Sequence, residues 1–148
     1  MHRLIDRVLL MGLIASILPL GACSQHDSHA AHGESPAQVE KIDGSSLSRV
    51  TLTEKAMERI ALETVAVEER DLNGSTRQVV PYSSLIYDST GNTWIYTSPQ
   101  PRTFVRLQVS VDRIEDGWVY LSDGPAAGTT VASVGVAELY GSETGVGH

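Results

Sequence analysis

Three histidines near the N-terminus have types and spacing that could support chemistry. His26, His29 and His32 recur at steps of three, and the carboxylates of Asp27 and Glu34 lie beside them. Imidazole and carboxylate groups together suit zinc, copper or nickel, and a flexible segment can wrap around such an ion. The pattern predicts weak capture of zinc or copper, for loading or buffering rather than catalysis. The alternative is a solvated polar segment whose histidines have no ligand role.

The remaining part of the chain is poor in catalytic groups. The other histidines are His2 and His148, and the single cysteine is Cys23. Residues 47–140, which we expect to fold, thus hold no constellation of the Ser-His-Asp or Cys-His kind and no ordinary structural zinc site. A carboxylate pair is the one remaining option, but most of the acids lie in predicted turns, where local hydrogen bonds explain them; these acids are Asp88, Asp112, Glu115, Asp116 and Asp123. We therefore predict no catalytic residue and no enzymatic activity.

Cys23 follows a pattern typical of exported proteins. A basic head with Arg3 and Arg7 precedes an apolar run at residues 8–20, and two small residues come just before the cysteine. This three-part pattern predicts a secretory signal peptide at residues 1–22. As a helix the apolar run would span about 20 Å, less than the roughly 30 Å hydrocarbon core of a bilayer, so we expect no stable transmembrane helix here.

Residues 20–23, Leu-Gly-Ala-Cys, resemble the lipobox of bacterial lipoproteins. In that class the cysteine thiol receives diacylglycerol, the preceding peptide is removed and the new amine is acylated. The resemblance implies a covalent lipid at Cys23 and a protein anchored in the cell envelope, facing the periplasm. Ser24 follows Cys23 instead of Asp, which favours the outer membrane over the inner one. The alternative is an ordinary signal peptide cut near Cys23, which would leave a free thiol.

The charge of the chain limits its partners. The sequence has 11 Lys+Arg and 18 Asp+Glu, a formal net charge of −7. Without Arg3, Arg7 and Asp6 of the signal peptide, nine basic and seventeen acidic residues remain, a charge of −8. Such an acidic surface repels nucleic acid and anionic headgroups, so we expect no nucleic-acid partner and membrane attachment only through the lipid.

Composition divides the mature chain into three parts. Residues 23–46 are rich in small and polar side chains and too poor in bulky apolar ones to offset the entropy of ordering, so they are predicted to form a lipidated, flexible, His-containing tether. Residues 47–140 are long enough for one small domain. Residues 141–148 are predicted to be a flexible tail.

The pattern within residues 47–140 is mainly that of β-structure. Residues 105–111 alternate apolar and polar side chains, as a half-buried strand does. Thr53 is placed to cap a short helix in which Ala56, Met57 and Ile60 share one face. Turn-forming residues separate further predicted strands at 47–52, 62–67, 78–80, 84–87, 93–97, 118–121 and 130–136. The expected fold is a small antiparallel β-barrel or sandwich with one short helix.

Aromatic residues form two pairs at period two, Trp94 with Tyr96 and Trp118 with Tyr120. Their predicted strands could be neighbours, which favours core packing or cross-strand pairing. The alternative is an exposed aromatic patch that binds a partner.

Two stretches resemble the periplasmic adaptor subunits, or membrane fusion proteins, of resistance-nodulation-division (RND) efflux pumps. The first is VTLTEKAMERIALETVAV at 50–67, and the second, at 80–135, includes VPYSSLIYD at 80–88 and GPAAGTTV at 124–131. In that family the two segments combine into the membrane-proximal β-domain, and the long chain between them forms the other domains. Here only residues 68–77 separate them, and no long heptad pattern is present. The resemblance implies an isolated membrane-proximal-like domain at 47–140.

The expected function is that of a non-enzymatic accessory protein of the envelope. Its β-domain would dock to an RND transporter or to a full-length adaptor, in an efflux system that could transport metals. The first alternative is a periplasmic metal-binding lipoprotein that uses the histidines of the tether. The second alternative is an envelope lipoprotein without any link to a pump.

Calorimetric titration with zinc and with copper tests the histidine segment. The mature chain carrying Cys23→Ser should release heat of metal binding, because three imidazoles can converge on one ion. The variant in which His26, His29 and His32 are all alanine should lose that heat. Equal heats from the two proteins would rule out metal capture by this segment.

Overall fold

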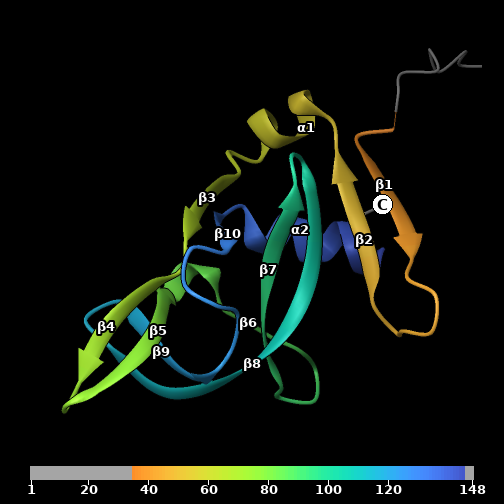
Figure 1. The fold of residues 1–148 in the computed structure, drawn as a ribbon. Helices are drawn as coiled ribbons and strands as arrows, with labels where there is room; N and C mark the ends of the chain where they lie inside the picture. Colours follow the sequence, from red (N-terminus) through yellow and green to blue (C-terminus); the bar gives the residue numbers. More distant parts are fainter. Residues whose placement is uncertain (1–34, 146–148) are drawn as a thin grey trace, which may run out of the picture. The chain divides into compact units, whose positions relative to one another are not determined.

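The computed structural model describes residues 35–145 and confirms the expected fold class of mainly antiparallel β-structure (Figure 1). The elements in chain order are β1 (Ala37–Lys41), β2 (Ser48–Leu52), α1 (Glu54–Arg59), β3 (Glu63–Ala66), β4 (Glu68–Leu72), β5 (Ser75–Pro81), the 3₁₀ turn η1 (Tyr82–Ser84), β6 (Ile86–Tyr87), β7 (Thr93–Gln100), β8 (Thr103–Glu115), β9 (Trp118–Asp123), β10 (Thr130–Val134) and α2 (Val136–Thr144).

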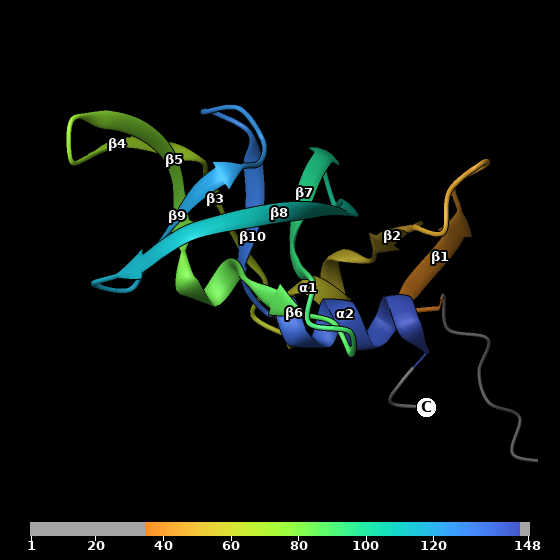
Figure 2. The same ribbon diagram turned by 90° about the horizontal axis from the view of Figure 1, so that it is seen from below.

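One sheet with the strand order β3-β10-β7-β8-β9-β5-β4 makes up most of the domain, and it curls back on itself. Its two end strands, β3 and β4, are consecutive in the chain, with only Val67 between them. The Val67 N–H donates to the Thr129 carbonyl (2.9 Å), and the Gly128 N–H donates to the Val67 carbonyl (2.8 Å). The long strand β8 pairs with β2 and β7 through its first half and with β9 through its second (Figures 1 and 2).

The curled sheet buries residues on both of its faces. One buried cluster includes Ile95 and Val131, and a second includes Tyr96 and Ala132 together with Leu139 of α2. Ile95 and Tyr96 are neighbours on β7, so their side chains point to opposite faces, yet both are fully buried. The strand therefore lies between two apolar layers, and α2 covers the second of them.

The short helix predicted after Thr53 is confirmed as α1. The Thr53 hydroxyl accepts a hydrogen bond from the Ala56 N–H at 3.2 Å, which satisfies one of the free amides at the helix start. Ala56 is buried, whereas Met57 and Ile60 are partly buried against the same cluster. The cap and the apolar face thus lie where the sequence places them.

Two segments differ from the prediction, one at each end of the domain. The flexible tether was expected to reach Ser46, but residues 37–41 form β1, paired in register with β2. Most of β1 is exposed and it is held by backbone hydrogen bonds, and its only apolar alternation, Ala37 and Val39, is too short to predict a strand.

The predicted tail is wrong for residues 141–144, which belong to α2. The strand expected at 130–136 ends at Val134, and Gly135 turns the chain with a φ of +74°. Val136, Leu139 and Tyr140 then follow at helical spacing, with the first two buried and the third partly buried. Burial of this apolar stripe against the sheet stabilises a helix of only nine residues.

Replacement of Gly135 by alanine should destabilise the domain more than the same change at Gly145. Both glycines flank α2 with φ near +70°, so both variants lose about 1–2 kcal/mol for the left-handed conformation. A Cβ at position 135 would also lie 2.9 Å from the Ile60 carbonyl oxygen, whereas at 145 it would meet nothing within 4 Å. We expect a further loss of about 1–3 kcal/mol for Gly135→Ala, measured by denaturant unfolding. Equal losses would contradict this close packing.

Candidate functional site

The residues predicted to carry chemistry, Cys23, His26, His29 and His32, lie outside residues 35–145, the part that the structure describes. Within that part, no group of three or more His, Cys, Asp or Glu side chains could hold a metal ion. None of the helices at 35–145 is long and apolar enough to cross a membrane. The folded domain offers a different candidate site.

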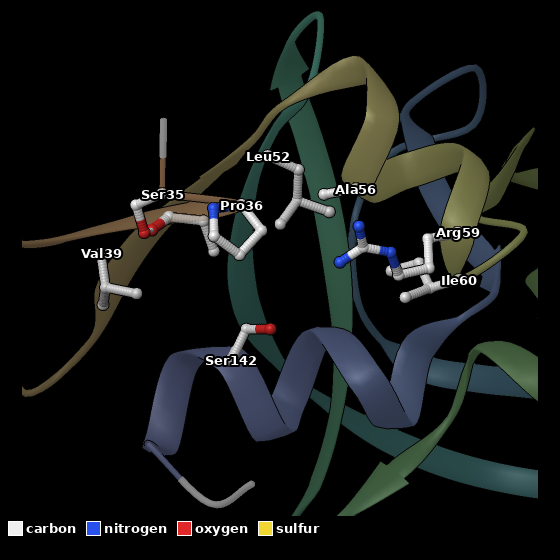
Figure 3. Close-up of a pocket in the computed structure, with 9 residues that line it drawn as sticks. Ser35, Pro36, Val39, Leu52, Ala56, Arg59, Ile60 and Ser142 are labelled. Carbon is white, nitrogen blue, oxygen red and sulfur yellow. Dashed lines mark hydrogen bonds between the residues drawn. The ribbon is translucent and has the colours of Figure 1, made fainter. Parts of the chain in front are cut away.

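A groove of about 480 Å³ lies between β1, α1 and α2 (Figure 3). Its lining is largely apolar and includes Ala37, Val39, Leu52, Ala56 and Ile60. Figure 3 shows Val39 and Arg59 at opposite ends of the groove, with Pro36 and Leu52 between them. The groove therefore follows β1 toward the end of α1.

Arg59 is the charged side chain in this lining. It lies in the last turn of α1, is exposed, and forms no ion pair with any residue between 35 and 145. The two hydroxyls at the groove already donate locally, Ser35 to the Ala37 carbonyl (2.8 Å) and Ser142 to the Glu138 carbonyl (2.9 Å). Arg59 is thus the group in the lining with donors to offer a ligand.

One edge of β1 is open, because within the described domain this strand pairs only with β2. The Thr53 N–H donates to the Pro36 carbonyl (3.0 Å) and the Ile42 N–H to the Leu47 carbonyl (3.2 Å). Bonded residues alternate along an antiparallel ladder, so Ala37, Val39 and Lys41 direct their backbone groups away from β2.

Val39 lies at the centre of this open edge. The Ala37 carbonyl is already bonded to the Ser35 hydroxyl, whereas both backbone groups of Val39 face outward. The Val39 side chain is 45% exposed although it is apolar. Unpaired backbone groups beside an apolar groove are the components of a peptide-binding site.

A buried ion pair holds α2, which forms one wall of the groove. Arg106 Nη2 donates to Glu143 Oε1 at 3.3 Å, and Arg106 Nε lies 3.2 Å from Glu143 Oε2 in an ion-pair contact. The two side chains are only 13% and 4% exposed. The Arg106 guanidinium also lies 4.5 Å from the centroid of the Trp94 ring and 5.2 Å from that of Tyr140. Because β8 carries Arg106 and α2 carries Glu143, the pair fixes the helix on the sheet.

Tyr96 and Asp88 extend this network. The Tyr96 hydroxyl donates to Glu143, and burial together with that carboxylate raises the pKa of the hydroxyl far above its usual range. Asp88 accepts hydrogen bonds from the Thr90 hydroxyl (2.7 Å) and from Trp94 Nε1 (2.9 Å), and these bonds hold the pKa of its carboxyl well below the usual range. The 88–92 loop thereby positions Trp94 beside Arg106.

Three of the five acids weighed as a carboxylate pair have separate partners. Asp88 accepts hydrogen bonds from its own loop and from Trp94, Asp112 pairs with Arg77 (3.1 Å), and Glu115 lies 3.7 Å from Arg113. None of these three carboxylates lines any of the cavities found within residues 35–145, so no two of them share one of these cavities.

The two aromatic pairs are not on neighbouring strands, because β7 and β9 each pair with β8 and not with each other. Tyr96 is fully buried in the core. Trp118 packs under the Arg70 guanidinium, 3.5 Å from the ring centroid, and Trp94 packs under Arg106. The aromatic residues therefore pack within the domain, as expected, but against arginines rather than against each other.

Sequence reasoning missed the groove because two of its walls were not predicted: β1 lies in the predicted tether, and α2 runs from the end of a predicted strand into the predicted tail. Helical spacing of Val136, Leu139 and Tyr140 was a signal that could have revealed α2. The residues of β1 carry no comparable signal. The sequence could not single out Arg59, because its lack of an ion-pair partner among residues 35–145 depends on the tertiary structure.

Replacement of Glu143 by alanine should lower the free energy of unfolding by about 3–5 kcal/mol, because it leaves the Arg106 charge buried without its partner. Asp112→Ala is the matched control, since it breaks the Arg77 pair, whose side chains are 35% and 39% exposed. That change should cost about 0–1 kcal/mol. Denaturant unfolding followed by tryptophan fluorescence measures both. Losses of similar size would show that the buried pair does not hold α2.

The groove offers apolar surface, one guanidinium and outward-facing backbone groups, a combination suited to binding. No protein-family model, curated protein or solved structure was found to match this chain.

Proposed function

We propose that this chain is a non-enzymatic lipoprotein of the cell envelope, anchored through Cys23, whose β-domain docks onto an RND efflux transporter or its full-length adaptor. The observation that carries the proposal is the pairing of the two adaptor-like stretches. β3 of the first stretch pairs with β10 of the second, and β2, where the first stretch begins, pairs with β8. The two stretches thus fold together, which supports the proposal because the two segments combine into one β-domain in the family that they resemble.

Side-chain packing also joins the two stretches. Val50 and Ala56 of the first stretch share one buried cluster with Phe104 and Ala132 of the second. Val67, the last residue of the first stretch, belongs to the other cluster with Val131. The two stretches, 50–67 and 80–135, therefore form one packed unit, which supports a domain that can dock as a rigid body.

Residues 68–77, which separate the stretches, form most of a β-hairpin made by β4 and β5. Asn73 and Gly74 have φ values of +53° and +80°, and the Gly74 N–H donates to Asp71 Oδ1 at 2.9 Å. The hairpin occupies the place in the sequence where the resembled family carries its long intervening chain. A tight turn here supports the role of an accessory domain.

Lipid attachment would favour docking by confining the search to the membrane plane. Twelve residues lead from Cys23 to Ser35, which bounds their reach at about 40 Å. A partner embedded in the same membrane would meet the domain at high effective concentration. Docking could then succeed with a small interface.

Mass spectrometry of the native protein tests the anchor. We expect a chain that begins at Cys23 with added acyl mass, and the Cys23→Ser variant should leave the membrane fraction. A native chain that retains residues before Cys23, or that carries an unmodified thiol, would contradict the anchor.

Co-purification after mild cross-linking of native membranes tests the partner. The lipidated chain should recover an RND transporter or adaptor, and the Cys23→Ser form should recover much less at equal expression. Recovery of neither protein by an intact lipidated chain would contradict the proposed docking.

A further inference from the structure

We propose that the open edge of β1 and the groove beside it bind an extended strand of a partner protein, with apolar side chains and a carboxylate near its C-terminal end. This proposal deepens the proposed function, since it rests on docking by the β-domain and names the chemistry of the docked segment. Strand addition needs free backbone groups, a surface for alternate side chains and a feature that sets the register. The domain supplies each of these.

The backbone groups come from Val39. Its N–H and carbonyl face away from β2. Residues 36 and 42 bond toward the β2 side, and every second residue between them does the same, which leaves residue 39 facing outward. On the same edge, the Ala37 carbonyl is already bonded to the Ser35 hydroxyl. A partner strand would therefore centre on Val39, and the ladder would be limited at its Ala37 end.

The surface for side chains is the groove itself. Ala37 and Val39 lie on the face of β1 that lines the groove. Leu52 of β2 and Ile60, which follows α1, complete this apolar part of the lining. Alternate side chains of a strand added beside β1 would point to this same face. Apolar residues at those positions would cover Val39, which is otherwise 45% exposed.

Arg59 would set direction and register. Val39 lies at one end of the groove and Arg59 at the other, beyond the start of β1 (Figure 3). A strand antiparallel to β1 would run from Val39 toward Ser35, so its last residues would approach Arg59. Because Arg59 has no ion-pair partner among residues 35–145, a carboxylate there would complete a charge-assisted hydrogen bond.

A second copy of this chain would fit the site less well. Two β1 strands centred on Val39 would place Lys41 of the second copy opposite Ala37, at the end of the groove that leads to Arg59. That arrangement brings a second cation toward Arg59 instead of a carboxylate. Charge complementarity therefore favours an acidic partner strand over self-association.

The test uses the ¹⁵N-labelled mature chain carrying Cys23→Ser and two synthetic capped hexapeptides, Thr-Val-Thr-Val-Thr-Glu and Val-Thr-Val-Thr-Val-Glu, which cover both alternations. At least one should shift the amide signals of Val39 and its neighbours. Its counterpart with Gln in place of Glu should bind about tenfold more weakly or worse. Shifts that avoid β1, or no binding by either peptide, would overturn the proposal.

Variants of the protein show which of its residues bind the peptides. Arg59→Gln should remove the difference between the Glu and Gln peptides, whereas Arg113→Gln, at an exposed site outside the groove lining, should preserve it. Val39→Pro, at a position whose N–H faces the open edge, should abolish binding of both peptides while the remaining amide signals stay in place. Discrimination that survives Arg59→Gln would overturn the role of this residue.

Two further results separate the proposal from its alternatives. A dimer in sedimentation that Val39→Pro dissociates would show that a second copy covers the edge, and would overturn an acidic partner strand. Unchanged co-purification of a transporter or adaptor by lipidated Val39→Pro would overturn strand addition but leave the proposed function intact. Failure of the unaltered lipidated chain to recover either would overturn the function itself.

Discussion

The contact between Arg106 and Glu143 is the interaction on which the shape of the candidate site depends. A buried charge is tolerated only with its partner in place, so the pair ties α2 to β8 more strictly than apolar packing would. Trp94 lies against the same guanidinium and is itself held by Asp88. Because Ser142, next to Glu143 on α2, lines the groove, the position of that wall depends on the Arg106–Glu143 contact.

The same helix is needed because the sheet has two apolar faces. Tyr96 and Ala132 belong to the cluster that α2 covers, while Ile95 and Val131 belong to the cluster enclosed by the curled sheet. The chain has a single cysteine, so no internal disulfide supports this arrangement. Stability must therefore come from burial on both faces, which a sheet of this size can achieve only with α2 and the β1–β2 hairpin in place.

The open edge of β1 is partly protected against unspecific strand pairing but remains accessible at Val39. Open strand edges invite aggregation, and proteins limit this risk with proline and charged residues. Glu40 and Lys41 do so here, and Val39 beside them is an exposed apolar position. At the far end of the adjoining groove this acidic chain places Arg59, a cation that forms no ion pair with any residue at 35–145. An open edge flanked by charged residues in this way suits a short strand with a matching carboxylate rather than unspecific strand pairing.

The sequence by itself determined the mainly β fold, the strand at 105–111 and the capped start of α1, because alternation and capping are local patterns. It also carries the predictions for Cys23, His26, His29 and His32, which lie outside the part that the structure describes. Tertiary structure alone decided that residues 37–41 pair as a strand, that the helix at 136–144 packs on the sheet, and that Arg59 ends a groove between them. The spacing of Val136, Leu139 and Tyr140 favours a helix, but the ion pair that holds it joins residues 37 positions apart. The pairing of β1 rests on backbone hydrogen bonds, so neither placement can be read from local sequence.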